Sequence, residues 1–306
     1  MSDLGGRMRV GAMLPLFVDD PARVIGFARR AEALGFDGVF AFDHLLPLHQ
    51  APDRPSFEVF SSLAAVAAAT DGLTVGTLVT RASLRPAGLL AKLAASLDDV
   101  AAGRVVLAVG TGDDLSRGEH EAFGIPTMDR ATRRRHLEDT VSAVRSLLTG
   151  RTWPGSELVP PLSGPLLPRR PGGQGPPVWV GGLSEEVVRV AGRVADAWNG
   201  WGIDVDGFAR RVAVLHEEAE AAGRTVPATW GGIALVGRDR AEADRLAERR
   251  GERPSGAWVG DPRGAADRLQ RLAAAGATWA VMLLAGPADR LEVVGREVLP
   301  RLRDGS

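Results

Sequence analysis

Gly-Arg-Val-Val-Leu-Ala-Val-Gly-Thr-Gly-Asp, residues 103–113, is the most informative stretch of the sequence. Its run from Val105 to Gly110 is apolar and rich in β-branched side chains, without alternation, which is typical of a strand buried on both faces. Gly-Thr-Gly ends the run, and there the backbone can approach a ligand because glycine has no Cβ. Asp113 and Asp114 follow. A buried strand that brings glycines and carboxylates to a sheet edge predicts an α/β enzyme.

Eight strand-like runs occur along the chain, and most are followed by apolar residues at helical spacing. The predicted strands are 10–14, 38–42, 74–79, 105–110, 178–181, 197–200, 232–236 and 279–284. The predicted helices are 21–34, 57–69, 86–102, 129–148, 206–222 and 262–275. Repeated strand–helix units predict a parallel sheet, and eight of them in 306 residues predict a (β/α)₈ TIM barrel. A doubly wound open sheet is the alternative, which the absence of Gly-x-Gly-x-x-Gly after the first strand disfavours.

Two stretches depart from this repeat, although a single domain over residues 1–306 is expected. Residues 151–177 are rich in proline and glycine and too long for a plain loop. They predict an ordered insertion over one rim, after the fourth β/α unit. Residues 251–260 form a shorter break that contains Trp258, and residues 1–7 are expected to be a loose N-terminal tail.

The composition excludes several classes of protein. A net charge of −1 argues against nucleic acid or an anionic membrane as the main partner. The absence of cysteine excludes disulfides, thiolate nucleophiles and cysteine-ligated metals. No metal site is predicted, because no His-Glu-x-x-His and no His-x-His on the first strand occurs. The chain has no apolar run of about 18 residues and no signal-peptide core at its start, so a cytoplasmic enzyme is expected.

Candidate catalytic residues are sought where the strands end, because catalysis in such barrels occurs at the C-terminal ends of the strands. His44 follows Asp43 at the end of the second strand, and an imidazole there can exchange a proton near neutral pH. A structural histidine that caps a loop is the alternative. Asp113 is likewise a candidate acid or, alternatively, a turn or helix cap.

Candidate cofactor-binding residues follow the fifth and sixth predicted strands. Gly-Gly-Leu-Ser at 181–184 leaves a strand and enters a helix with Ser184 as N-cap, and exposed amides there favour a phosphate. A tight turn with a capped helix is the alternative. Trp198 and Trp201 fit packing against the barrel wall, whereas Asn199 between them is more typical of a site. Together the strand ends predict a site for a flat, phosphate-bearing cofactor.

These strand ends resemble the bacterial luciferase-like superfamily over nearly the whole chain. The resemblance rests on short motifs in a fixed order. They are Val-Gly-Ala-Met-Leu-Pro at 10–15, Ala-Glu-Ala-Leu-Gly-Phe-Asp-Gly-Val-Phe at 31–40, Asp43-His44, Leu-Ala-Ala-Ser-Leu-Asp at 93–98, Gly103-Arg104, Glu-Ala-Phe-Gly at 121–124, Arg130, Pro-Pro-Val-Trp-Val-Gly-Gly at 176–182, Ala-Asp-Ala-Trp-Asn at 195–199 and Gly-Asp-Pro at 260–262.

The resemblance implies a (β/α)₈ barrel that uses FMN or the deazaflavin coenzyme F420. The F420 branch is closer, because its dehydrogenases share Asp-His after strand two and Gly-Thr-Gly-acid after strand four. It implies hydride transfer between F420 and a small organic substrate: an alcohol or carbonyl, an activated alkene or an imine. His44 would be the base on a substrate hydroxyl, and Asp113 would stand where relatives have an acid. The implied cofactor-binding residues are Asp43, Val79, Thr80, Gly110, Thr111, Gly112, Ser116, Gly181, Gly182, Leu183, Ser184 and Asn199, with a backbone bend or cis peptide expected at 79–80.

Two other functions stay open. An FMN-dependent monooxygenase of the same superfamily would need oxygen and a separate reductase, and a barrel that binds a cofactor without turnover is the third reading. Glucose 6-phosphate is disfavoured as substrate, because relatives grip the phosphate with lysines and Lys92 is the only lysine here. Trp153, Trp201 and Trp258 suggest an apolar rim for an uncharged substrate. Relatives often dimerise, so a homodimer is one expectation.

Overall fold

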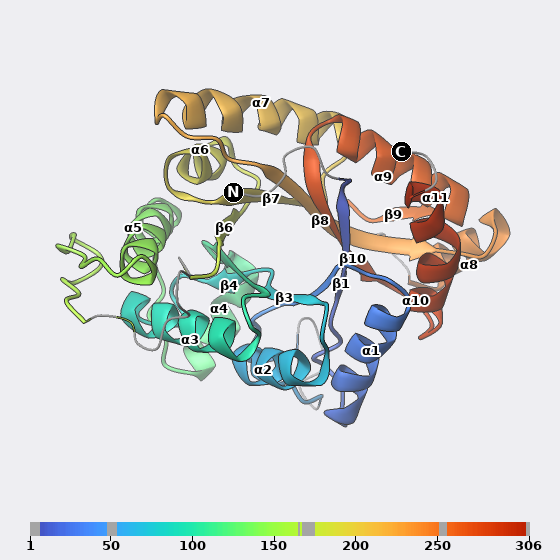
Figure 1. Cartoon of the computed structure of the whole chain (residues 1–306), viewed down its shortest axis with the longest axis horizontal. Helices are drawn as coiled ribbons and strands as arrows, with labels where there is room; N and C mark the ends of the chain where they lie inside the picture. The colour runs from blue at the N-terminus through green and yellow to red at the C-terminus, as the bar shows by residue number, and fades with distance from the viewer. Residues whose placement is uncertain (1–6, 48–53, 165, 167–174, 251–255, 304–306) are drawn as a thin grey trace.

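The computed structural model describes residues 7–47, 54–164, 166, 175–250 and 256–303, and in them eight parallel strands close a barrel (Figure 1). In barrel order the strands are β1 (Arg9–Met13), β2 (Gly38–Ala41), β3 (Thr74–Thr77), β5 (Val105–Gly110), β6 (Val178–Gly181), β7 (Ala197–Trp201), β8 (Ala228–Val236) and β10 (Ala277–Leu284). β10 pairs with both β8 and β1, which closes the sheet. The predicted barrel is confirmed, and the open-sheet alternative is wrong.

Helices surround the barrel in the order that the repeat predicts (Figure 1). They are α1 (Ala22–Ala33), α2 (Val59–Ala69), α3 (Ala87–Val100), α5 (Arg130–Leu148), α6 (Glu185–Val194), α7 (Val205–Ala221), α8 (Arg240–Arg250) and α9 (Pro262–Ala274). Shorter elements are α4 (Arg117–Ala122), α10 (Arg290–Val293), α11 (Leu299–Arg303), β4 (Thr80–Arg81) and β9 (Trp258–Gly260). These five elements and α8 are not among the predicted ones, because the short elements span too few residues to show a period and α8 has too few apolar residues.

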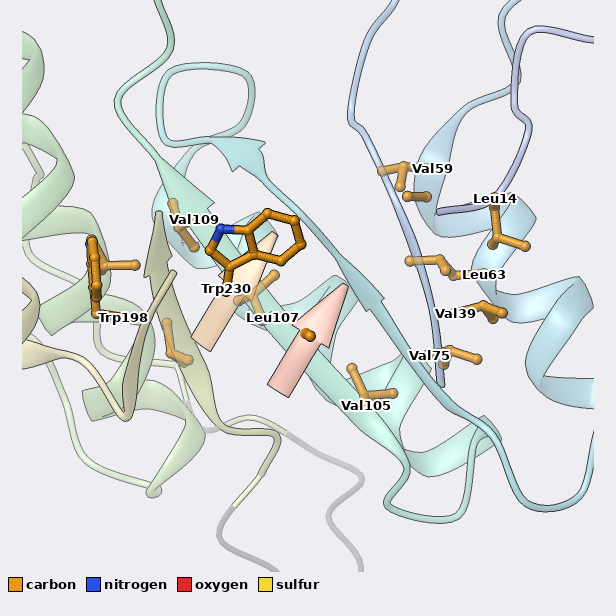
Figure 2. Packing of buried hydrophobic residues seen from close by; sticks show 14 of the residues in the cluster. Leu14, Val39, Val59, Leu63, Val75, Val105, Leu107, Val109, Trp198 and Trp230 are labelled. Carbon is orange, nitrogen blue, oxygen red and sulfur yellow. The ribbon is translucent and has the colours of Figure 1, made fainter. Parts of the chain in front are cut away.

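The fifth strand along the chain shows why its sequence does not alternate. Val105, Leu107 and Val109 point outward and join the large cluster under the helices (Figure 2). Val106 and Ala108 point inward and join a second cluster inside the barrel. Because both faces of β5 are buried, every position is apolar. The prediction of a strand buried on both faces is confirmed.

The inner cluster fills the barrel, and a partly buried apolar surface lies on it at the C-terminal ends of the strands. Deep inside, the rings of Phe40, Trp179 and Trp279 pack with centroids 5.4 to 6.1 Å apart. At the mouth, four apolar side chains from different strand ends are only partly buried against this cluster. They are Phe42, Val79, Trp201 and Leu283. We call these four residues the apolar platform.

The described part of the 151–177 insertion lies on the outer wall of the barrel. Trp153 and Leu162 pair as an antiparallel bridge, and Ser156 donates a hydrogen bond of 2.7 Å to Asp139 of α5. The Trp153 indole donates to Val159 within the same loop, so this tryptophan packs under its own loop. Residues 165 and 167–174, like residues 1–6 of the expected tail, lie outside the described residues. None of the described helices is both long enough and apolar enough to span a membrane.

Candidate active site

His44 forms a hydrogen bond with a carboxylate from a distant part of the chain. Its Nδ1 lies 2.9 Å from Oε1 of Glu119 on α4, 75 residues further along the chain. The His44 side chain is 16% exposed and that of Glu119 is 7% exposed. Among the described residues Nε2 of His44 has no hydrogen-bond partner. The imidazole therefore has one nitrogen committed to the protein and one available at the mouth of the barrel.

Arg81 completes this arrangement from β4. Its Nη2 forms an ion pair with Oε2 of Glu119, and its side chain is 4% exposed. Burial raises the pKa of Glu119, but the hydrogen bond and charge of His44, with those of Arg81, outweigh burial and lower it. His120, next along α4, lies against the Pro126 carbonyl instead, and burial followed by the charge of Arg81 lowers its pKa. Glu119 is thus an ionised carboxylate held between two nitrogen donors.

The lowered pKa of Glu119 gives a pH-dependent contribution to stability. A carboxyl whose pKa is depressed in the folded state stabilises the fold above its unfolded pKa of about 4.3, and this contribution is lost as the pH falls through the folded value. We therefore expect the difference in unfolding free energy between wild type and Glu119→Gln to be largest at neutral pH. It should shrink as the pH falls below about 4.3. Urea unfolding of both proteins across this range measures the difference, and one that grows on acidification would contradict the assignment.

Asp43 is buried in a second cluster beside the first. Its Oδ2 accepts a hydrogen bond of 2.5 Å from Thr80 and forms an ion pair with Arg85, whose guanidinium also contacts Glu58 at 2.8 Å. The side chain of Asp43 contacts Thr80 and Arg85, whereas that of His44 contacts Glu119. The two residues that the sequence places together therefore serve different clusters.

Val79 forms the part of the apolar platform that lies over β5 and β6. The peptide bond between Leu78 and Val79 is cis, one residue before the bend expected at 79–80. A Cβ on Gly110 would lie 2.7 Å from one Val79 methyl, and a Cβ on Gly181 would lie 2.6 Å from the other. The two glycines are therefore required by close approach of the valine, and the structure brings Val79, Gly110 and Gly181 together as predicted.

The close approach of Val79 to the two glycines predicts that an added methyl group destabilises the fold more when Val79 is present. Gly181→Ala should lower the free energy of unfolding by about 1–3 kcal/mol, because overpacking forces its neighbours to move. In a Val79→Ala background the same change should cost less, because the opposing methyls are gone. Urea unfolding of the four proteins measures the coupling. Gly26→Ala on α1 is the matched control, since its Cβ would meet nothing within 4 Å. Equal costs in both backgrounds would refute the contact.

The loop after β5 makes a turn that Asp113 caps. Gly112 has a φ of +71°, a conformation that favours glycine, and its missing Cβ faces the side chain of Arg81. Asp113 is exposed, and its Oδ1 accepts from the backbone N and from Oγ of Ser116 at 3.1 and 2.9 Å. Thr111 donates to the Gly112 carbonyl. Asp113 therefore has the capping role that the sequence left open, and its role as an acid stays a prediction.

The loop after β6 presents unused backbone donors. Ser184 is the N-cap of α6, as predicted, with its Oγ accepting from Val187 N at 3.4 Å. Arg211 donates to the Leu183 carbonyl at 2.7 Å and so fixes the loop. The amides of Leu183 and Ser184 have no acceptor among the described residues. Free amides at the start of a helix are suited to an anion.

Asn199 is the central residue of β7 and is buried. Its Nδ2 donates to Thr229 at 3.0 Å, and Gly182 N donates to its carbonyl at 3.2 Å. Trp198 is buried on the outer side, stacked on Phe208, whereas Trp201 belongs to the apolar platform. Trp198 therefore packs against the barrel wall, as predicted, whereas Trp201 is only partly buried.

Sequence reasoning missed Glu119 and Arg81. Arg81 lies just after the third predicted strand, 74–79, but carried no recognisable chemical signal of its own. Glu119 lies two residues before the family motif at 121–124, and nothing in the local pattern separates it from Glu121. Only the three-dimensional fold brings either residue to His44.

Comparison with known proteins gives consistent matches. The chain matches the model of the luciferase-like monooxygenase family over residues 5–293. It is 29% identical to the F420-dependent glucose-6-phosphate dehydrogenase of Microbacterium testaceum over 74% of this chain, a match that spans 63% of that relative. The protein of the same name from Beutenbergia cavernae is 26% identical over 92% of this chain and 94% of its own length.

A solved structure gives the same picture of the fold. The F420-dependent secondary alcohol dehydrogenase in complex with an F420-acetone adduct superposes with a TM-score of 0.83. The match covers 98% of this chain and 100% of that one at 19% identity, so it shows a shared fold.

Proposed function

The chain belongs to the luciferase-like monooxygenase family, and on that premise we propose that it is an oxidoreductase that uses coenzyme F420. It transfers a hydride between this cofactor and a small organic substrate. The names of two relatives, both F420-dependent dehydrogenases, support the choice of cofactor. The observation that carries the proposal is His44: Nδ1 is held by Glu119, and Nε2 faces no protein partner at the mouth of the barrel.

The residues at the mouth fit a flat cofactor that carries a phosphate. The apolar platform is only partly buried by the protein itself, so a planar ring can cover it. Gly110 and Gly181 leave room for the Val79 side chain within this surface. The free amides of Leu183 and Ser184 would hold the phosphate, with the Ser184 cap fixing their direction. F420 satisfies both requirements, and so does FMN.

When bound, F420 exchanges a hydride at its C5 position, and the protein manages the proton that accompanies it. For an alcohol substrate, Nε2 of His44 takes the hydroxyl proton as the carbinol carbon gives up its hydride. In the opposite direction the imidazolium returns that proton to the carbonyl oxygen. The platform orients the reactants and excludes water from the reacting atoms.

The charge arrangement supports an uncharged substrate over a sugar phosphate. Among the described residues, four arginines near the mouth are each paired with an acid. The pairs are Arg81 with Glu119, Arg85 with Asp43 and Glu58, Arg133 with Asp114, and Arg134 with Glu186. A substrate phosphate that bound one of these four arginines would have to displace its acid, which an uncharged alcohol, enone or imine does not.

Anaerobic turnover tests this function. Oxidised F420 is offered with a panel of alcohols, and reduced F420 with ketones, enones and imines, while the absorbance of the cofactor is followed. We expect conversion with at least one class in the absence of oxygen and of any reductase. Conversion only with reduced FMN and oxygen would instead establish the monooxygenase alternative that the family also contains.

A further inference from the structure

We propose that Glu119 is the positioning residue of His44 and that it fixes which ring nitrogen can take up a proton. The inference deepens the proposed function, because it concerns the residue that we take to be the base. The buried Glu119 carboxylate accepts the hydrogen bond from Nδ1 of His44, and this keeps Nε2 of the neutral ring unprotonated. Arg81, in turn, determines which oxygen of Glu119 serves His44.

The hydrogen bond between His44 and Glu119 sets the tautomer. An ionised carboxylate can only accept hydrogen bonds, so the hydrogen shared with Nδ1 at 2.9 Å must belong to the imidazole. A neutral ring with its hydrogen on Nδ1 has a lone pair on Nε2. The ring is also confined sideways by Phe17 and Phe42, whose centroids lie 6.3 and 5.9 Å away. The imidazole therefore presents a proton acceptor at Nε2, which forms no hydrogen bond with any described residue.

Arg81 holds the other carboxylate oxygen and cannot readily find another partner. Its guanidinium is buried, and Nε and Nη1 have no hydrogen-bond acceptor among the described residues. Apart from the ion pair, its Nη2 reaches only the Asp43 carbonyl, at 3.4 Å. A buried cation with so few acceptors retains the oxygen that it has. Each oxygen of Glu119 is thus assigned to one partner.

Because each oxygen of Glu119 has its own partner, we expect Glu119→Gln to change the tautomer of His44. Glutamine has one oxygen and one amide NH₂, and Arg81 requires the oxygen because two donors cannot face each other. The NH₂ then faces Nδ1 of His44 and donates to it. The ring hydrogen moves to Nε2, which can no longer accept a proton from the substrate. We expect kcat to fall by about 10²- to 10⁴-fold, the usual contribution of a general base.

Nitrogen NMR of the full chain without any cofactor tests the inference. Histidine-labelled wild type should show neutral His44 as the Nδ1–H form, and Glu119→Gln should show the Nε2–H form. Loss of the signal in His44→Asn identifies it among the five histidines. Glu121→Gln, an exposed residue of the same helix, is the matched control and should leave the tautomer and kcat unchanged.

The results that would overturn this inference differ from those that would overturn the proposed function. A wild-type His44 in the Nε2–H form overturns the inference, and that measurement needs no variant to fold. An unchanged tautomer in folded Glu119→Gln also overturns it. If the tautomer changes as expected but no F420 turnover exists, the positioning role stands and the proposed function fails.

Discussion

His44→Asn should lower kcat by about 10²- to 10⁴-fold while the cofactor still binds. The expectation follows from the position of the imidazole, which is partly exposed at the edge of the platform with Nε2 free of protein partners. Asparagine retains a polar group of similar reach but cannot take up a proton near neutral pH. A positioned general base contributes about this factor to the rate. Steady-state turnover with F420 and the best substrate of the panel measures the effect.

The control for this prediction is a histidine far from the mouth. His216 is exposed on α7, and His216→Asn should leave kcat unchanged. Cofactor affinity of both variants is compared by fluorescence titration, which separates loss of the base from loss of binding. A His44→Asn enzyme with wild-type kcat would remove this residue from the chemistry, and Asp113 would become the leading candidate.

Glu119→Ala should lower the free energy of unfolding by about 3–5 kcal/mol at neutral pH. The change removes the carboxylate that pairs with Arg81 and leaves a guanidinium that is 4% exposed without its counter-ion. Breaking a buried pair by deleting one partner costs this much because the remaining charge stays buried. Urea unfolding of the full chain, followed by circular dichroism, measures the loss.

Glu121→Ala supplies the matched comparison on the same short helix. Its side chain is exposed, so the change should alter stability by less than about 0.5 kcal/mol. A loss of similar size in both variants would show that α4 tolerates no substitution and that the ion pair is not the cause. A Glu119→Ala protein as stable as wild type would show that Arg81 finds another acceptor.

The barrel could be predicted from the sequence because strands that are buried on both faces are apolar at every position. β5 is apolar at every position, since the barrel interior and the helices bury its two faces, and β6 shares this property. Parallel strands place their C-terminal ends at one rim, so His44, Val79, Gly110 and Gly181 could be grouped from the sequence. The structure confirms that Val79, Gly110 and Gly181 meet.

The pairing of side chains within the site could not be predicted in the same way. Glu119 lies on a short helix after a loop, and its contact with His44 depends on where that loop folds. Asp113 has the more suggestive sequence position, directly after Gly-Thr-Gly, yet its carboxylate caps the next turn. Local pattern identifies which residue types reach the rim, whereas the tertiary fold decides which of them touch.

Equilibrium binding of two cofactors to the purified full chain tests the assignment of F420 most directly. Oxidised F420 and FMN are titrated separately, and quenching of cofactor fluorescence reports the bound fraction. We expect saturable binding of F420, and we expect Gly181→Ala to weaken it. Tight binding of FMN with no detectable binding of F420 would contradict the assignment.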